Sequence, residues 1–340
     1  MSNHASESDQ TAIGVDLGGT KIEVALVDSR GSVKKRVREP TEAKKGYTVV
    51  KEHIITAVKQ VLDKTGFLPG GIGVGIAGQV EMETGAVLFA PNLHWTNRPL
   101  RSDLSDTLEL PVAITNDVRA ACWGEWLFGA GKGSNDLVAV FVGTGIGGGV
   151  IAGGRILSGC SNTFGEIGHI PVDLDGPKCH CGSWGCLEAI AGGWAIAQQA
   201  REAVGSGPHD GQALLRLAGG RREAITAEMV VRALGEGDPL SKKIMDRASE
   251  ALIAASVGIV NAFNPCRLIL GGGVVEGYPK LIDLIREGVG RRALGAATQR
   301  LEVLKARLGN DAGVIGAAAF ALKSFKPESR LRKRGAKEKR

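Results

Sequence analysis

Three cysteines and a histidine in the middle of the chain are spaced as metal ligands are spaced. Cys179, Cys181 and Cys186 fall within eight residues, and His169 precedes the first of them by ten. Structural zinc sites use four sulfur or nitrogen ligands in a tetrahedron, and these side chains form a complete set of that kind. Because the set is closed, we expect a metal that shapes a loop and performs no chemistry. The alternative is three free thiols beside a surface histidine.

A glutamate stands on each side of this cluster, at Glu166 and Glu188. Alone, each would be a solvated surface acid. A rigid metal loop between them gives both a reason to face one pocket and to accept hydrogen bonds from hydroxyl groups. The sequence therefore favours a site for a polar ligand that carries hydroxyl groups.

Two glycine-rich turns are suited to phosphate groups, because glycine lets backbone N–H groups approach an anion. The first is Asp16-Leu-Gly-Gly-Thr-Lys21 and the second is Gly143-Thr-Gly-Ile-Gly-Gly-Gly149. The first lacks the GxxxxGK[ST] of a Walker loop. The second matches the dinucleotide fingerprint GxGxxG, but a strand is expected at 150–152, where that fingerprint requires a helix. Plain hairpins are the alternative for each turn. Together, and with an acid before the first, they favour nucleotide phosphates.

Two further features lie where strands give way to helices. Gly271-Gly-Gly273 offers a surface without side chains for a nucleotide base or ribose, with tight helix–strand packing as the alternative. Asn116-Asp117 is typical of a helix N-cap. A carboxylate at a strand end can also accept a proton from a substrate hydroxyl during phosphoryl transfer.

Hydrophobic periodicity predicts the elements that position these residues. Strands are expected over 11–15, 22–28, 71–77, 112–115, 137–142, 150–152 and 267–270. Helices are expected over 47–64, ending at Gly66, and over 187–204, 239–261, 278–291 and 312–323, with a loop over 205–222. Both halves of the chain open with a strand, a glycine turn and a strand, which suggests a duplicated α/β lobe.

Composition narrows the class of protein. The 340 residues suffice for two lobes, and the 50 glycines are about twice the usual share. The formal charge of +6 arises in residues 326–340, which hold eight Lys or Arg and two Glu, so the remainder balances to zero. Specific nucleic-acid binding is therefore not expected, and the tail should be solvated and disordered. The polar start lacks a signal region and no run of about 18 apolar residues occurs, so we expect a cytoplasmic protein without a membrane partner.

The ordered motifs resemble the ROK family of repressors, open-reading-frame proteins and sugar kinases. The resemblance covers residues 11–325 and rests on Asp16–Lys21, Asn116-Asp117, Gly143–Gly148, Glu166-x-x-His169 and Cys179-x-Cys-Gly-x-x-Gly-Cys186-x-Glu188. Within the family, Pro91-Asn-Leu-His-Trp95 before Pro99-Leu100 is most similar to bacterial ATP-dependent glucokinases.

This resemblance implies the actin-like ATPase fold, which is ribonuclease H-like, with two α/β lobes. The small lobe would span 11–125 with the helix 312–324 packed back onto it, and the large lobe 126–311. Residues 1–10 and 325–340 would be disordered ends. A homodimer or higher homo-oligomer is implied as well.

The implied activity is Mg²⁺-dependent transfer of the γ-phosphate of ATP to the 6-hydroxyl of glucose. Asp117 would be the general base, Asp16 would orient Mg²⁺, and zinc would be structural. His169 would turn one ring nitrogen to zinc and the other to the sugar. The implied sugar contacts are Gly78, Asn92, Asn116, Asp117, Glu166, His169 and Glu188. The implied nucleotide contacts are Asp16, Gly18, Gly19, Thr20, Lys21, Thr144, Gly145 and Gly272.

One departure leaves the substrate open. Val118-Arg119-Ala120 follows the base where many members have Ala-Asn-Ala. Mannose, fructose, N-acetylmannosamine and N-acetylglucosamine are therefore alternatives to glucose, and polyphosphate is an alternative donor. A sugar-responsive transcriptional regulator is the alternative of another class. Such members carry a helix-turn-helix domain ahead of the kinase-like part, for which a first strand near residue 11 leaves no room. An NAD-dependent oxidoreductase would explain neither the cysteine cluster nor Asn116-Asp117.

Overall fold

The structure is a computed structural model that describes residues 10–63, 65, 68–205 and 211–325. Disorder was predicted at 1–10 and 325–340; of these, 1–9 and 326–340 lie outside the described residues, as does the helix end predicted at Gly66. The described chain folds into two compact units. The first holds the residues up to Lys132, the segment Ser158–Phe164 and the chain from Asn310 onward; the second holds Gly133–Leu157 and Gly165–Gly309.

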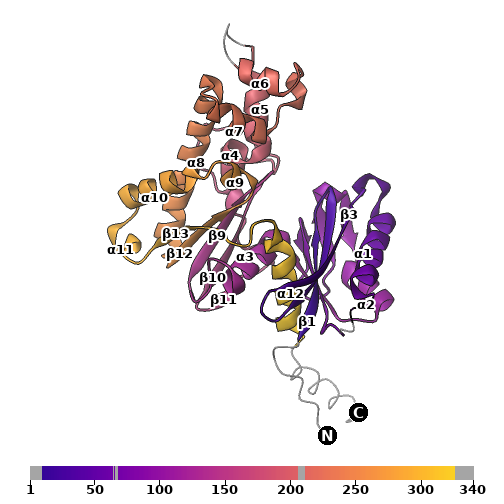
Figure 1. Cartoon of the computed structure of the whole chain (residues 1–340). Helices are drawn as coiled ribbons and strands as arrows, with labels where there is room; N and C mark the ends of the chain where they lie inside the picture. The colour runs from indigo at the N-terminus through magenta and orange to yellow at the C-terminus, as the bar shows by residue number, and fades with distance from the viewer. Residues whose placement is uncertain (1–9, 64, 66–67, 206–210, 326–340) are drawn as a thin grey trace. The chain divides into compact units, whose positions relative to one another are not determined.

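The first unit is built on a five-stranded sheet. Its strand order is β3 (Val33–Pro40), β2 (Lys21–Asp28), β1 (Thr11–Leu17), β4 (Ile72–Ile76) and β8 (Val112–Asn116). Strands β1, β4 and β8 are parallel, whereas β2 is antiparallel to both β1 and β3. Helix α1 (Tyr47–Leu62) contacts β2 and β3, and α12 (Ala312–Ser324) contacts β1 and β4 (Figure 1). Strands β1, β2 and β4 are buried almost throughout because helices cover both faces of the sheet.

Helix α12 approaches its neighbours so closely that three glycines are required. A methyl group on Gly14 of β1 would lie 1.9 Å from the carbonyl oxygen of Val314. On Gly73 of β4 it would lie 1.8 Å from the carbonyl oxygen of Ala317. Gly316 faces α3 (Asp117–Phe128), where a methyl group would lie 1.7 Å from the carbonyl oxygen of Ala120. The last helix therefore packs backbone against backbone on the sheet and on α3.

The second unit repeats the plan of the first sheet. Its strand order is β11 (Arg155–Ile156), β10 (Ile146–Ala152), β9 (Leu137–Val142), β12 (Arg267–Gly271) and β13 (Glu302–Lys305). Strands β9, β12 and β13 are parallel, and β10 is antiparallel to β9 and β11. The strand directions thus match those of the first sheet position by position. This repeat agrees with the duplicated strand, turn and strand of the sequence.

Helices complete the second unit around α8 (Pro239–Phe263), which contacts α4, α5, α7 and α10. The helices other than α8 are α4 (Leu187–Ala191), α5 (Gly193–Ala203), α6 (Gln212–Leu217), α7 (Ala227–Gly235), α9 (Gly273–Gly277), α10 (Lys280–Arg292) and α11 (Gly295–Thr298). The two units together also contain short 3₁₀ turns: η2 (Ala43–Lys45), η3 (Pro91–Leu93), η4 (Ile167–His169), η5 (Arg222–Ala224) and η6 (Gly309–Asp311). No helix in the described part of the chain has the length and apolarity needed to span a membrane.

Several elements differ from the sequence prediction. The helix predicted over 187–204 is divided into α4 and α5 because Gly192 is extended, with ψ at 150°. The loop predicted over 205–222 contains α6, and α9 begins inside the glycine run at Gly273. Strand β3 was missed because its charged, half-exposed residues lack apolar alternation. The helix α2 (Leu100–Leu108) and the three-stranded sheet of β5 (Gln79–Val80), β6 (Val87–Ala90) and β7 (Trp95–Arg98) were also not predicted.

The packing of α12 predicts that Gly73→Ala destabilises the first unit. The new methyl group would collide with a backbone oxygen that no side-chain rotation can move, so the free energy of unfolding should fall by about 3 kcal/mol. Gly258→Ala is the control, because Gly258 lies in α8 with nothing within 4 Å of the added atom. This control should gain up to about 1 kcal/mol from helix propensity. Urea unfolding of the two variants checks both signs, and equal stabilities would contradict the close approach.

Candidate active site and metal cluster

The carboxyl ends of the parallel strands in the first unit bring together Asp16 and Asp117. Asp16 is the penultimate residue of β1, and Asp117 begins α3 directly after β8. The strand between them contributes Gly75, which is in register with Asp16 and Thr115. A methyl group on Gly75 would lie 3.4 Å from the Cα of Asp117. Two acids therefore lie close together at the carboxyl ends of the strands, where α/β proteins usually bind their ligands.

Asp16 is in an environment that disfavours its negative charge. Burial, and then the charge of Asp117, raise the pKa of Asp16 from 3.8 to about 7, while Lys21 acts in the opposite direction. The start of α12 packs against this carboxyl group, since a methyl group on Gly313 would lie 2.9 Å from the Asp16 Cγ. A divalent cation would supply the positive charge that two neighbouring carboxylates need, so these residues fit Mg²⁺.

Three of the predicted sugar contacts surround the same edge. The side-chain oxygen of Asn116 accepts a hydrogen bond from the backbone N–H of Arg119 at 3.1 Å, so the predicted N-cap is confirmed. The Asn116 amide also donates to the carbonyl oxygen of Gly78 at 3.5 Å. Asn92 lies against the first glycine turn, because a methyl group on Gly19 would be 3.0 Å from its Cβ.

The first glycine turn is a hairpin that Thr41 holds from outside. The backbone N–H of Gly18 donates to the carbonyl oxygen of Lys21 at 3.1 Å. The hydroxyl of Thr41 donates to the carbonyl oxygen of Gly18 at 2.7 Å. The backbone N–H of Thr41 donates to the carbonyl oxygen of Thr20 at 3.0 Å. Thr41 is fully buried, and the sequence offered no signal for it beyond its position after a proline.

Arg119, two residues after Asp117, joins α3 to the segment Ser158–Phe164. Its buried guanidinium donates to the side-chain oxygen of Asn162, to the backbone oxygen of Asn162 at 2.9 Å and to that of Phe164 at 3.4 Å. Asn162 also donates to the carbonyl oxygen of Val80 at 2.7 Å. The residue that departs from the family pattern thus fixes a segment to α3. Sequence reasoning missed Asn162, whose only signal was its place in a polar stretch.

The second glycine turn is tied to the start of α5. The backbone N–H groups of Gly193 and Trp194 donate to the carbonyl oxygens of Gly143 and Thr144, both at 2.9 Å. Strand β10 (Ile146–Ala152) begins inside the GxGxxG pattern and continues beyond it, so no helix follows the pattern and the dinucleotide interpretation is excluded for it. Gly272 directly follows β12 and lies beside Val142, the residue before this turn. Its φ is +92°, and an added methyl group would lie 2.5 Å from the carbonyl oxygen of Val142, so glycine is required there.

In the second unit, Ile146 lies between Glu188 and the turn η4 (Ile167–His169). The Ile146 N–H donates to one carboxylate oxygen of Glu188 at 2.7 Å, and the indole N–H of Trp194 donates to the other at 3.2 Å. The turn η4, which follows Glu166 and ends at His169, packs on the carbonyl side of Ile146: a methyl group on Gly168 would lie 2.1 Å from the Ile146 carbonyl oxygen. Glu166 is exposed.

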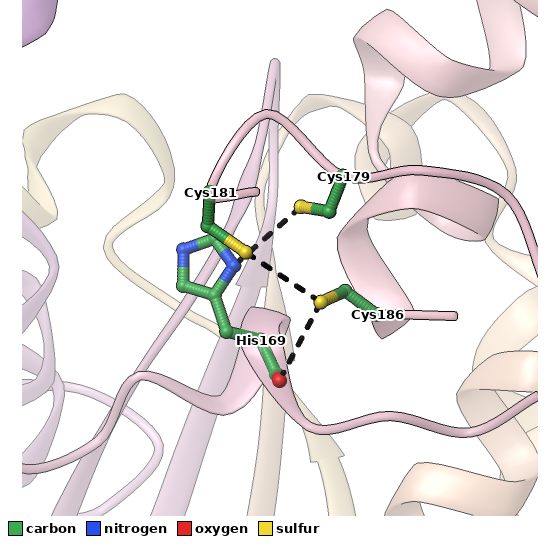
Figure 2. Close-up of side chains that lie close together, drawn as sticks. All are labelled: His169, Cys179, Cys181 and Cys186. Carbon is green, nitrogen blue, oxygen red and sulfur yellow. Dashed lines mark hydrogen bonds between the residues drawn. The ribbon is translucent and has the colours of Figure 1, made fainter. Parts of the chain in front are cut away.

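The four predicted metal ligands converge, as Figure 2 shows. Their ligand atoms all lie within 4.8 Å of one another. The sulfurs of Cys181 and Cys186 are 3.7 Å apart, and Cys179 Sγ lies 3.7 Å from His169 Nδ1. An ion bound to sulfurs at about 2.3 Å in a tetrahedron holds them about 3.8 Å apart. The spacing excludes disulfides and fits a zinc ion, with Nδ1 as the histidine donor.

The thiols of this cluster need a cation to ionise together. Burial raises the pKa of Cys179 to about 12 and also raises the pKa of Cys186. The backbone N–H of Ser183 lowers the pKa of Cys181. Because only thiolates bind a metal strongly, zinc binding should release protons and stabilise the loop at the same time.

Comparisons with known proteins agree with the geometry. Residues 12–324 match the ROK family. The glucokinase of Thermotoga maritima is 37% identical over 309 residues, which cover 91% of this chain and 96% of that protein. A crystal structure of a ROK family glucokinase from Streptomyces griseus in complex with glucose and AMPPNP has a TM-score of 0.81 and 34% identity, covering 92% of this chain and 99% of that one. The xylose repressor of Caldicellulosiruptor bescii is 30% identical, with 77% of its length covered.

The repeated α/β units with paired acids and glycine hairpins define a two-lobed, actin-like protein of ribonuclease H-like type. The fold class implied by the sequence is therefore confirmed. The chain belongs to the ROK family.

The raised pKa of Asp16 predicts a pH dependence of stability. Between about pH 4 and pH 7 the folded state keeps a proton that the unfolded state releases near 3.8, so the free energy of unfolding falls as pH rises through this range. Relative to Asp16→Asn, the wild type should lose stability between about pH 5 and about pH 8 in urea unfolding without Mg²⁺. A difference that is the same at both pH values would show that the pKa is not raised.

The metal cluster predicts one zinc per chain. Cys181→Ser should lose this metal, because a serine hydroxyl does not replace a thiolate ligand. Cys160→Ser is the matched control, since Cys160 is exposed and lies outside the cluster. Elemental analysis of the purified variants measures the outcome. A Cys181→Ser protein that keeps a full equivalent of zinc would rule out the assigned ligand set.

Proposed function

We propose that this protein is an ATP-dependent glucokinase that transfers the γ-phosphate of ATP to the 6-hydroxyl of glucose. The observation that carries the proposal is the placing of Asp117 beside Asp16 at the sheet edge, with a glycine hairpin after β1. The solved relative in complex with glucose and AMPPNP supports the choice of substrates. Identity of 37% to a glucokinase, against 30% to a repressor, supports a kinase.

Asp117 is suited to act as the general base. It stands in the first turn of α3, where the partial positive charge of a helix N-terminus stabilises a carboxylate. Its carboxylate would take the proton from the sugar 6-hydroxyl as the hydroxyl oxygen bonds to the γ-phosphorus. The bond from that phosphorus to the bridging oxygen breaks, and ADP leaves with the electron pair. The proton stays on Asp117 until product release.

The two glycine turns and Asp16 would handle the phosphates. Gly18, Gly19, Thr20 and Lys21 would cradle phosphate oxygens in the first unit; Thr144, Gly145 and Gly272 would contact the nucleotide in the second. Mg²⁺, when bound, neutralises phosphate charge. Asp16 would orient it through water once its own proton is lost. Lys21 is half-exposed and 3.6 Å from Glu23, so its ammonium is held near the turn.

The sugar would be held by side chains with hydrogen-bonding groups in both units. Gly78, Asn92 and Asn116 would serve in the first unit, and Glu166, His169 and Glu188 in the second. His169 directs Nδ1 toward the cysteines, so Nε2 is the nitrogen available to a hydroxyl. Zinc would hold η4 and the start of α4 together, which keeps these groups aligned without taking part in the reaction.

Asp117→Asn should lower kcat by about 100-fold to 10,000-fold, because an amide cannot accept the proton. The KM values should change little, since the side-chain shape is retained. Asp238→Asn is the control: Asp238 caps α8, and asparagine caps helices about as well. A coupled assay of ADP release measures both. An Asp117→Asn enzyme with full kcat would disprove the assignment of the base.

Substrate choice is tested with a panel of sugars and donors. Glucose with ATP should give the highest kcat/KM among glucose, mannose, fructose, N-acetylmannosamine and N-acetylglucosamine, with ATP and polyphosphate compared as donors. A preference for another sugar or for polyphosphate would replace glucokinase by another kinase of the family. Absence of any phosphorylation, together with salt-dependent binding to a specific DNA, would favour a regulator.

A further inference from the structure

Trp194 lies between the metal cluster and the second glycine turn, and the proposed chemistry gives it no role. It is the second residue of α5. Its ring stacks on His180, with centroids 3.9 Å apart and planes inclined by 20°. His180 stands between Cys179 and Cys181 in the chain, so two metal ligands fix its position. The ring also packs against the buried group of Cys179, Cys186 and Ala189.

The polar groups of Trp194 reach two other parts of the site. The indole N–H donates to Glu188 Oε1 at 3.2 Å, and the backbone N–H donates to the carbonyl oxygen of Thr144 at 2.9 Å. Glu188 Oε2 accepts from the N–H of Ile146 at 2.7 Å. One residue therefore touches the metal loop with its ring face, a predicted sugar ligand with its ring edge, and the glycine turn with its backbone.

We propose that Trp194 is a positioning residue that couples metal occupancy to the orientation of Glu188, and through Glu188 to sugar affinity. The proposal rests on the proposed function, in which Glu188 binds the sugar. A bound metal would fix Cys179 and Cys181, and with them His180, which lies between them in the chain. The stacked His180 ring then fixes the plane of the Trp194 indole. The indole N–H in turn fixes one of the two oxygens of Glu188.

Two donors from different segments are needed to orient the Glu188 carboxylate. A glutamate side chain has three rotatable bonds, and a single hydrogen bond from Ile146 would leave the second oxygen free to rotate about it. The indole N–H closes this freedom and leaves further lone pairs on each oxygen for sugar hydroxyls. Loss of the N–H should therefore weaken sugar binding while the proton transfer at Asp117 proceeds as before.

The first test is Trp194→Phe, which keeps an aromatic face and removes the N–H. The sugar KM should rise about tenfold with kcat within about twofold, the signature of lost orientation and intact chemistry. Trp184→Phe is the matched control, because Trp184 lies in the metal loop between Cys181 and Cys186, is 60% exposed and has its ring beside Lys178. An unchanged KM in Trp194→Phe would overturn the proposal. If that variant does not fold, His180→Ala takes its place: it should raise KM in the same direction, and an unchanged KM would overturn the coupling.

The second test measures whether metal and indole act through one path. Chelation of zinc should raise the sugar KM of the wild type, and should raise it by a smaller factor in Trp194→Phe. Factors that multiply would mean two independent effects and would overturn the coupling.

A third measurement does not depend on sugar phosphorylation. Adding zinc to the metal-depleted Trp184→Phe protein should change the fluorescence of Trp194, and the double variant Trp184→Phe/Trp194→Phe should lose this change. A change that persists in the double variant would overturn the coupling. If the wild type phosphorylates no sugar, the proposed function fails, and this measurement still decides whether Trp194 senses the metal.

Discussion

The backbone approach of α12 to β1, β4 and α3 is the contact on which the first unit depends. Gly14 and Gly73 admit the helix to the sheet, and Gly316 admits it to α3. Because β1 carries Asp16 and α3 carries Asp117, a single helix sets the distance between the two acids. Gly313, at its start, lies directly against the Asp16 carboxyl group. Small residues along α12 therefore help to place the two acids as well as to form the core.

In the second unit, different contacts hold the hairpin turn that follows the first strand of the sheet. Its sheet has the same order of strand directions, but its hairpin turn is secured by α5 and by a carboxylate, Glu188, that accepts from Ile146. The cysteine cluster holds the segment that carries η4 close to the start of α4. Between β11 and α4, the regular element of the chain is the three-residue turn η4. Such a segment buries little apolar surface, and a bound metal would order it instead.

Much of this arrangement could be predicted from the sequence. Strands β1, β2, β9 and β12 have apolar runs next to glycine turns, and the His169 and cysteine spacing predicted the convergent cluster. The predictions failed where local pattern and tertiary contact disagree. Gly192 divides a continuous helical pattern because its backbone packs beside Thr144, and β3 pairs with β2 despite its charges. The contacts of Arg119 with Asn162, and of Trp194 with Glu188 and His180, join residues that no local spacing relates.

The position of α12 near the end of the sequence affects the order in which the first unit can be completed during translation. The sheet of the first unit is translated early, yet the helix that covers Gly14 and Gly73 is encoded after the whole of the second unit. On the ribosome, one face of β1 and β4 must stay uncovered while more than half of the protein is made. Domains that can fold as they emerge are protected from misassembly, and this unit has no such protection until its last helix is released. The first unit therefore completes its packing only after α12 has been made.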